Sequence, residues 1–427
     1  MNLLIRLAKT ARAIKGAIIA IHRTSNLREV IIKFTKIITN EGLRGIVSRL
    51  ERLKRKDYTE WIKRYEALTK AELESMQQRQ SGFLHRPLIS VILPVHNPKP
   101  EWLMQAIESI CQQIYPNWEL CIADDASTDN KIRKTLNYYQ QRDPRIKVVF
   151  RKLNGHIVEC SNSALELAVG DWVALLDHDD LISPDALYWA IDAINKFPHV
   201  RMIYSDEDKI DVSGNRSDPY FKSDWNPDLF YSHNMFCHLG IYQADLLKEA
   251  GRFRPGFEGA QDYDLALRCI ELINIEQIHH IPRVLYHWRA HINSTAYSAS
   301  TKPYAMLSGE RALNEYFHRC KIRANAKLIG HGYRIRYDLP ENPPLVSIII
   351  PTRNRLDLLR PCIQSIKQLT SYPNYEIIVI DNGSDDPQML AYLNQTDSAE
   401  REFTVMKDDR PFNYSALNNK AVGEAKG

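Results

Sequence analysis

The chain has 427 residues, 44% of them hydrophobic and 25% charged, which is typical of a globular protein and long enough for two or three domains. Its seven cysteines are scattered without a C-x-x-C pair, which disfavours a disulfide framework or a zinc site and favours a reducing, cytoplasmic compartment. No apolar run approaches the length of a membrane span or of a signal-peptide core.

The formal net charge of +4 is unevenly distributed. Residues 1–56 contain 14 Lys or Arg and three Glu, a net charge of +11, so the rest of the chain carries −7. Apolar residues from Leu3 to Ile21 recur on one helical stripe, with Lys and Arg beside it. We therefore expect helices over residues 1–85. They would either lie on an anionic membrane, at its cytoplasmic face, or dock on the body with their cations in water. Nucleic acid is disfavoured as a partner because no recognised binding motif accompanies the charge.

From residue 88 onward, short apolar strands alternate with helical segments. This alternation predicts a doubly wound α/β sheet with parallel strands, and ligands of such sheets bind at the carboxyl ends of the strands. A mixed, aromatic-rich stretch follows at 205–300, and a further helix is expected at 303–319. The predicted strands of the first part are 88–95, 118–123, 146–150 and 172–176, and its predicted helices are 101–114, 129–141, 160–169 and 185–196.

The chain repeats part of itself at a constant offset of 257 residues. SVILPVHNP returns as SIIIPTRNR, ELCIADDAS as EIIVIDNGS, and SNSALELAVG as NNKAVGEAKG. Three segments in one register are not expected by chance, so we predict a second, partial copy of the fold that lacks a counterpart of WVALLDHDD. The predicted parts are a basic helical region (1–85), a complete α/β unit (88–302), a helix with a connector (303–345) and the partial copy (346–427).

Acidic residues follow the predicted strand at 172–176. Since side chains two residues apart in an extended chain point to the same side, Asp177 and Asp179 are expected to converge. Two carboxylates at 4 Å repel by about 4 kcal/mol at an effective dielectric of 20, which a hard divalent cation such as Mg²⁺ or Mn²⁺ would offset. The alternative is a turn and capping cluster that opens the helix at 185–196.

Further polar residues lie at the same edge of the predicted sheet. Asp124 and Asp125 end the second strand, beside Pro94 and Asn97 at the end of the first. A carboxylate there can accept hydrogen bonds from a nucleobase or a ribose, although DDASTD is also rich in capping residues. The sequence alone leaves both readings open.

Two candidates lie further along the chain. In GAQDYDLALR, Asp262 stands in the first turn of an amphipathic helix. It is either an acid that interacts favourably with the helix dipole or a general base held over the same edge of the sheet. In VLYHWRAHINST, His287 follows an apolar strand and is the preferred ligand candidate. His280 and His291 are expected to be structural.

The succession SVILPVHNP, IADDASTD, LLDHDD, GAQDYDLALR and LYHWR resembles the family 2 glycosyltransferases. More closely, with YSDEDKID and HGYRIRYDLPENPPLVSIIIP, it resembles the bacterial tandem-domain members tied to rhamnan and O-antigen polysaccharide synthesis. The resemblance implies a GT-A fold, with a doubly wound mixed sheet. It also implies a nucleotide-diphosphate sugar donor (UDP- or dTDP-linked), a divalent metal, a glycan or lipid-linked glycan acceptor, and inversion at the anomeric carbon.

The resemblance also implies roles for single residues. Asp179 would bind the metal with His287, and Asp177 would support the metal or hold the ribose. Asp262 would be the general base that takes the proton of the acceptor hydroxyl, although Gln261 stands where the family usually has Glu. The residues that contact the nucleotide sugar would be Pro94, Val95, Asn97, Asp124, Asp125 and Asp177.

Two other functions are considered. A sugar nucleotidyltransferase would need a glycine-rich phosphate loop after its first strand, and LPVHNPKP contains no glycine. A catalytically degenerate transferase that serves as a scaffold or glycan-binding module is the stronger alternative, above all for residues 346–427.

Overall fold

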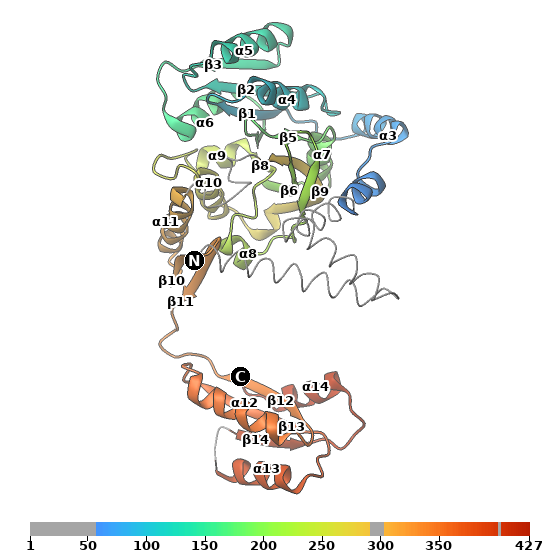
Figure 1. Ribbon diagram of the computed structural model, residues 1–427, viewed down its shortest axis with the longest axis vertical. Coiled ribbons are helices and arrows are strands. Elements are labelled where there is room, and N and C mark those ends of the chain that lie inside the picture. The colour runs from blue at the N-terminus through green and yellow to red at the C-terminus, as the bar shows by residue number, and fades with distance from the viewer. Residues whose placement is uncertain (1–56, 291–302, 400–402) are drawn as a thin grey trace, which may run out of the picture. The chain divides into compact units, whose positions relative to one another are not determined.

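The computed structural model describes residues 57–290, 303–399 and 403–427 (Figure 1). These residues belong to two compact units, Met1–Arg336 (unit 1) and Tyr337–Gly427 (unit 2), divided within the predicted connector. The prediction of a membrane-binding helix concerns residues 1–56, which lie outside the described residues. It therefore stays a prediction. In the described part of the chain, no helix is long and apolar enough to cross a membrane.

The first half of unit 1 is a parallel α/β sheet, as the alternating pattern predicts. Strand β1 pairs in parallel with β2 on one side and with β4 on the other, and β2 pairs with β3. Helix α6 begins four residues before its predicted start, where Gly155 donates its N–H to Asp125. The elements are β1 Ile89–Val95, α4 Pro100–Cys111, β2 Trp118–Asp124, α5 Asn130–Arg142, β3 Ile146–Phe150, α6 His156–Leu167 and β4 Trp172–Leu175.

The second half of unit 1 adds antiparallel strands, which makes the sheet mixed. Strand β8 runs antiparallel to both β4 and β6, while β6 and β9 are parallel, so the order is β3-β2-β1-β4-β8-β6-β9-β5 with β7 beside β6. The predicted mixed-sheet fold class is confirmed. The elements are β5 Leu181–Ile182, α7 Ala186–Lys196, β6 Met202–Ile210, β7 Arg216–Tyr220, α8 Pro227–Ser232, β8 Gly240–Gln243, α9 Ala244–Glu249, α10 Gln261–Ile270, the 3₁₀ turn η1 Ile275–Gln277 and β9 Ile278–Arg289.

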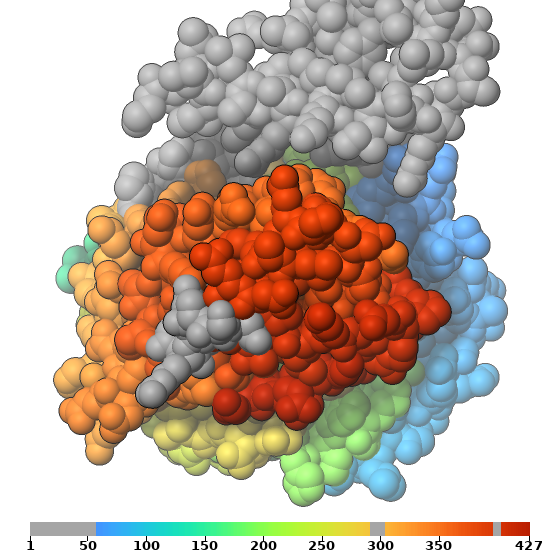
Figure 2. All heavy atoms as spheres, turned by 90° about the horizontal axis from the view of Figure 1, so that it is seen from below, coloured from blue at the N-terminus to red at the C-terminus, as the bar shows by residue number. Residues whose placement is uncertain are grey.

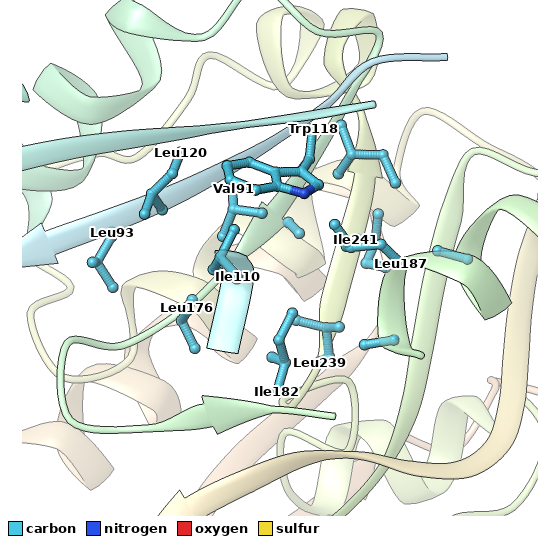
Figure 3. Packing of buried hydrophobic residues seen from close by; sticks show 14 of the residues in the cluster. Val91, Leu93, Ile110, Trp118, Leu120, Leu176, Ile182, Leu187, Leu239 and Ile241 are labelled. Atoms are coloured by element: carbon cyan, nitrogen blue, oxygen red, sulfur yellow. The ribbon is translucent and has the colours of Figure 1, made fainter. Parts of the chain in front are cut away.

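Apolar side chains cover both faces of this sheet. On one face, α4, α5 and α7 pack over β1 and β2. Figure 3 shows Val91 of β1 beside Trp118 of β2, and Leu93 of β1 near Leu120 of β2. On the other face, α6, α9, α10 and α11 (Pro303–Arg319) form a second core. Every side chain of β1 is buried. The rigid, two-sided core holds the carboxyl ends of β1 and β4 in place.

The flanking segments of unit 1 are partly as predicted. Residues 57–65 are helical, and α3 (Lys70–Ser81) begins with a capping box made by Thr69 and Glu72. The expected helix at 303–319 is confirmed. The connector, by contrast, contains a two-stranded sheet of β10 (Ala324–Ile329) and β11 (Gly332–Tyr337), which the proline-rich sequence did not indicate.

Unit 2 forms a three-stranded parallel sheet, ordered β12-β13-β14. Helices α12 and α13 pack on one face of it and α14 on the other, each over its own apolar cluster. Figure 2 shows the atoms of this unit, orange to red, packed closely together. The elements are β12 Val346–Thr352, α12 Leu356–Leu369, β13 Tyr375–Asp381, α13 Pro387–Ala399, β14 Phe403–Lys407 and α14 Tyr414–Glu424.

The two units repeat hydrogen bonds as well as sequence. In unit 1, Ser90 Oγ donates to Glu119 Oε1 at 2.6 Å and accepts from the N–H of Gly170 at 2.9 Å. In unit 2, the residues 257 positions later do the same: Ser347 donates to Glu376 at 2.7 Å and accepts from Gly427 at 2.9 Å. We call this arrangement the Ser–Glu lock. The lock thus recurs at the offset of 257 residues that the sequence repeat has.

Candidate functional site

A cavity lies at the carboxyl ends of β1 and β4, the edge that the sequence predicts for ligand binding. Three of the predicted site residues line it: Pro94 from β1, Asp177 after β4 and Asp262 at the start of α10. The complete lining in the described residues is Ile92, Pro94, Ile157, Ser161, Leu175, Leu176, Asp177, Cys237, His238, Phe253, Gln261, Asp262 and Tyr286.

The acidic loop after β4 is held from behind by β9. Asp180 is buried and accepts hydrogen bonds from the Tyr286 hydroxyl at 2.6 Å and from the Arg289 backbone N–H at 2.7 Å. The Arg289 guanidinium donates to the backbone oxygen of Asp179 at 2.5 Å. Asp180 therefore anchors the loop, while Asp177 is exposed to the cavity.

The loop carries more negative charge than its surroundings offset. The many protein atoms around the Asp177 carboxyl weaken its hydration and raise its pKa, although the side chain still contacts solvent in the cavity. The charge of His238 lowers this pKa, and repulsion from Asp179 and Asp262 raises it further. Burial, followed by repulsion from Asp179 and Asp177, also raises the pKa of Asp180 well above its usual value. Such a cluster of carboxylates favours a bound cation.

The donor set fits a divalent cation that is shared with a substrate. No group of three His, Cys, Asp or Glu among the described residues could hold a metal by itself. Asp177 and Asp179 offer carboxylate oxygens, and Mg²⁺ in particular is commonly bound by one or two carboxylates together with substrate phosphates. The described residues are therefore compatible with a metal that also binds a diphosphate.

The structure does not place His287 in the cavity with Asp177. Its Nδ1 lies 2.7 Å from Asp208 Oδ1, and its side chain lines a separate cavity beside Arg289 and Gln105. Asp208 is bound in turn by Tyr58 at 2.8 Å. The prediction that His287 completes the metal site has no support in this arrangement. His291 lies outside the described residues.

Asp262 is oriented by two neighbours. Asn234 Nδ2 and Cys237 Sγ both donate to its Oδ2 atom, at 3.0 and 2.7 Å. Gln261, the residue that departs from the family pattern, accepts a hydrogen bond from the N–H of Gly259 at 2.8 Å and so fixes the loop before α10. Asp262 thus stands in the first turn of α10, at the wall of the cavity, with its Oδ2 atom held by these two donors.

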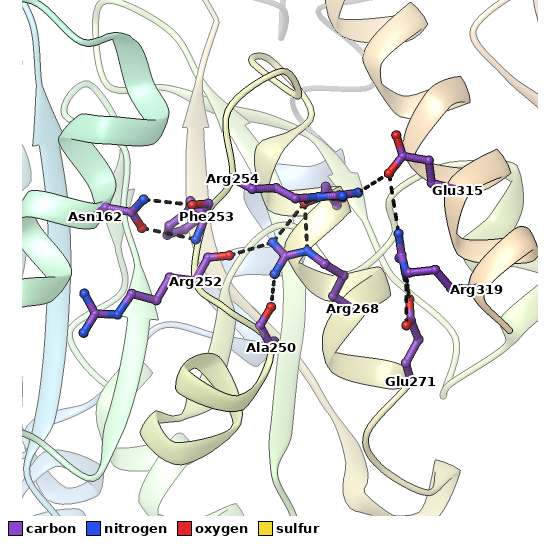
Figure 4. Close-up of polar contacts among 10 residues, drawn as sticks. Asn162, Ala250, Arg252, Phe253, Arg254, Arg268, Glu271, Glu315 and Arg319 are labelled. Atoms are coloured by element: carbon purple, nitrogen blue, oxygen red, sulfur yellow. Dashed lines mark hydrogen bonds and ion pairs between the residues drawn. The ribbon is translucent and has the colours of Figure 1, made fainter.

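A buried ion-pair network fixes α10 itself (Figure 4). Asp264, one turn from the helix start, is fully buried and lies 2.6 Å from the guanidinium of Arg254 and 2.9 Å from that of Arg268. Arg254 also pairs with Glu315 of α11 at 2.7 Å. Asp264 is therefore a structural residue, and the network sets the position of Asp262.

The predicted nucleotide-side residues are mostly used within the fold. Asp125 is buried and pairs with Arg151 at 2.8 Å. The side chain of Val95 is fully buried, so only its backbone can face a ligand, and its oxygen accepts from the N–H of Asp125. Asp124 differs, because its buried Oδ1 atom has no hydrogen-bond partner among the described residues.

Asn97 joins the loops that follow β1 and β2. Its backbone adopts a positive φ of 45°, its N–H donates to Ser127 Oγ at 2.9 Å, and its Oδ1 accepts from the N–H of Thr128 at 2.8 Å. The equivalent Asn354 of unit 2 binds the Ser384 hydroxyl in the same way. Asn97 is therefore a loop-bridging residue in this structure.

One charged residue of the cavity was missed at the sequence level. His238 lines it and pairs with Glu207 of β6, with Nδ1 2.9 Å from Glu207 Oε2, and its ring stacks on Tyr286 at 4.5 Å. Burial lowers the pKa of His238, but the hydrogen bond and charge of Glu207, together with the charges of Asp177 and Asp180, raise it to about 9. The acids of YSDEDKID were the available signal, because buried acids require nearby cations.

Comparisons with known proteins identify the family of the chain. The model of the family "Glycosyl transferase family 2" matches residues 90–251 and 347–427, together more than half of the chain. The uncharacterized protein y4gI of Sinorhizobium fredii is 49% identical over 370 residues, covering 86% of this chain and 40% of its own length. The O-antigen biosynthesis protein RfbC of Myxococcus xanthus is 34% identical over 375 residues, covering 87% of this chain and 28% of its own length.

The chain thus spans less than half the length of these two relatives. Among solved structures, TarS 1–349 of S. aureus with UDP-GlcNAc is 22% identical, with a TM-score of 0.43 over 54% of this chain and 72% of that one. The family assignment rests on the family model, which confirms the resemblance carried by the motifs. The chain belongs to glycosyl transferase family 2.

Proposed function

We propose that unit 1 transfers a sugar from a nucleotide-diphosphate sugar to a hydroxyl group of a growing surface polysaccharide, with inversion at the anomeric carbon. The observation that carries the proposal is the cavity where Pro94, Asp177 and Asp262 meet. These residues come from segments that are distant in sequence and lie at the ligand-binding edge of an α/β sheet. A carboxylate pair for the donor and a separate carboxylate for the acceptor are the parts that such a reaction needs.

Asp262 is assigned as the general base. It removes the proton of the attacking acceptor hydroxyl as the new glycosidic bond forms and the bond to the diphosphate breaks. The hydrogen bonds from Asn234 and Cys237 hold Oδ2, which supports proton transfer through the other oxygen, Oδ1. One displacement assisted by one base inverts the anomeric centre, whereas retention by a double displacement requires a second, nucleophilic carboxylate.

Asp177 and Asp179 are assigned to the diphosphate side of the donor. A divalent cation bound there would supply charge stabilisation for the departing nucleoside diphosphate. The backbone and side-chain contacts of Arg289 and Tyr286 keep the loop that carries both carboxylates in place. Asp124 has a buried oxygen without a hydrogen-bond partner among the described residues and is therefore the better supported of the two nucleoside candidates.

A surface polysaccharide is the proposed product because two relatives of the chain are named for the synthesis of such polymers. RfbC of Myxococcus xanthus is named for O-antigen biosynthesis, and TuaG of Bacillus subtilis, 40% identical over 102 residues, for teichuronic acid biosynthesis. The donor is proposed to be UDP- or dTDP-linked, and the acceptor a glycan or a lipid-linked glycan.

The test is turnover of a panel of UDP- and dTDP-sugars by the full chain with Mn²⁺, comparing wild type with Asp262→Asn. We expect the substitution to lower kcat by about 10²- to 10⁴-fold, the usual contribution of general base catalysis, without loss of donor binding. Asp381→Asn in unit 2 is the matched control and leaves turnover unchanged. Turnover of Asp262→Asn near the wild-type rate would refute the base assignment.

A further inference from the structure

Among the described residues that line the cavity, one side chain is basic and two are acidic. Of the described residues that line it, Asp177 and Asp262 are acidic and only His238 is basic. A cavity with two carboxylates repels a diphosphate unless positive charge stands opposite it. His238 is the protein group in a position to provide that charge.

The position of His238 is fixed by a buried charge network. Glu207 Oε2 accepts from both the backbone N–H and the ring Nδ1 of His238. The fully buried ammonium of Lys222 donates to the backbone oxygens of Cys237 and His238, at 2.9 and 2.8 Å, and lies 3.7 Å from Glu207. Stacking on Tyr286 fixes the plane of the ring.

This network leaves one ring nitrogen for a ligand. Nδ1 is used by Glu207, and among the described residues Nε2 has no hydrogen-bond partner. Burial raises the pKa of Glu207, but Lys222 and then His238 outweigh it and hold this pKa below its usual value. Glu207 therefore remains a carboxylate, which favours the doubly protonated ring of His238. A protonated imidazole with a free N–H, beside the loop of Asp177, is suited to donate to a phosphate oxygen.

We propose that His238 binds the diphosphate of the donor through Nε2, with Glu207 and Lys222 as the residues that position it. The inference rests on the proposed function, since it assigns a further donor-binding residue to the same cavity. No bond is made or broken by His238. Its role is to stabilise the charge of the diphosphate in the bound donor and on the leaving group.

The test is calorimetry on the full chain with Mg²⁺, titrating UDP and dTDP and, separately, uridine and thymidine. A hydrogen bond to a charged group contributes enough for His238→Gln to weaken binding of the preferred nucleoside diphosphate by about tenfold or more. Binding of the nucleoside alone stays unchanged. Glu207→Gln keeps the ring but removes its partner, and a smaller loss of the same kind is expected. His318→Gln, on the exposed surface of α11, is the matched control and binds as wild type does.

The outcomes separate the two proposals. Wild-type affinity for the diphosphate in His238→Gln overturns the role of His238 and leaves the proposed function intact. An equal loss for nucleoside and diphosphate also overturns it, because a merely structural residue would act on both. If thermal melting shows that His238→Gln does not fold, the result for Glu207→Gln decides in the same way. A wild-type chain that binds neither UDP nor dTDP overturns the proposed function, and the inference with it.

Discussion

The anchoring of α10 by Asp264 leads to a quantitative prediction. Replacing Asp264 by Asn keeps the shape of the side chain but removes the carboxylate that lies between Arg254 and Arg268. Breaking a buried ion pair from one side costs about 3–5 kcal/mol, because a buried charge loses its counter-ion. Here the remaining cations keep other acceptors, namely Glu315 for Arg254 and the backbone oxygens of Ala250 and Arg252 for Arg268. The expected loss in the free energy of unfolding is therefore at the lower end, about 3 kcal/mol.

Urea unfolding followed by tryptophan fluorescence measures this loss. All seven tryptophans lie before residue 289, so the signal reports unit 1 and not unit 2. Glu315→Gln is the matched control: it removes a partner of the same Arg254, but its side chain is 42% exposed, and such surface pairs contribute about 0–1 kcal/mol. A free energy of unfolding for Asp264→Asn within 1 kcal/mol of wild type, or equal to that of Glu315→Gln, would show that the network does not hold α10.

Two further predictions concern pH and metal. Burial raises the pKa of Glu119, but the ion pair with Lys147 and hydrogen bonds from Ser90 and Val169 outweigh it and hold this pKa below its usual value. The Glu119 carboxylate therefore stabilises unit 1 above the unfolded-state pKa of about 4.3. This stabilisation is lost as the pH falls through the lower folded-state pKa. Glu119→Gln is therefore expected to cost about 2 kcal/mol at pH 7 and progressively less below pH 4, and an equal cost in urea titrations at pH 7 and pH 3 would contradict this. Removal of divalent ions with EDTA is expected to abolish sugar transfer, and addition of Mn²⁺ or Mg²⁺ is expected to restore it. The Asp179→Asn variant is expected to need at least tenfold more metal for its half-maximal rate. Full activity in EDTA would refute a metal at the loop that carries Asp177 and Asp179.

The parallel half of unit 1 was predictable because its signals are local. Each of β1, β2, β3 and β4 is a short apolar run, and α4 and α5 carry a clear apolar stripe. The repeat predicted the same pattern in unit 2, and the Ser–Glu lock shows why the register is constant, since Ser, Glu and Gly must stay at fixed separations to bind one another.

The antiparallel half was not predictable in the same way, because its interactions are distant in sequence. Strand β6 carries three consecutive acids in its interior, which a local pattern would assign to a loop. Asp206 is matched by His280, Glu207 by Lys222 and His238, and Asp208 by Arg216. The partners come from other elements, so the strand is stable only once those elements are in place.

The site shows the same division. Asp177 and Asp262 were found from sequence because a strand end and a helix start are local features, and the structure brings both to one cavity. His287 was assigned from its place after an apolar strand, but its direction depends on Asp208 and β6. His238 was missed, since the acids of YSDEDKID call for a cation but nothing near His238 in the sequence indicates that it would bind Glu207, 31 residues away.

The compactness of unit 2 has a consequence for how unit 1 reaches its folded state. Unit 2 builds a sheet with helices on both faces from three strands and their own connections, all close in sequence. The matching residues 88–170 of unit 1 have the same strand order and the same Ser–Glu lock, so during synthesis on the ribosome this part can collapse before residues 171–336 emerge. Strand β6, with its three acids, would then be added to a parallel sheet that has already folded. The apolar core of residues 88–170 would thus form before the buried ion pairs of β6.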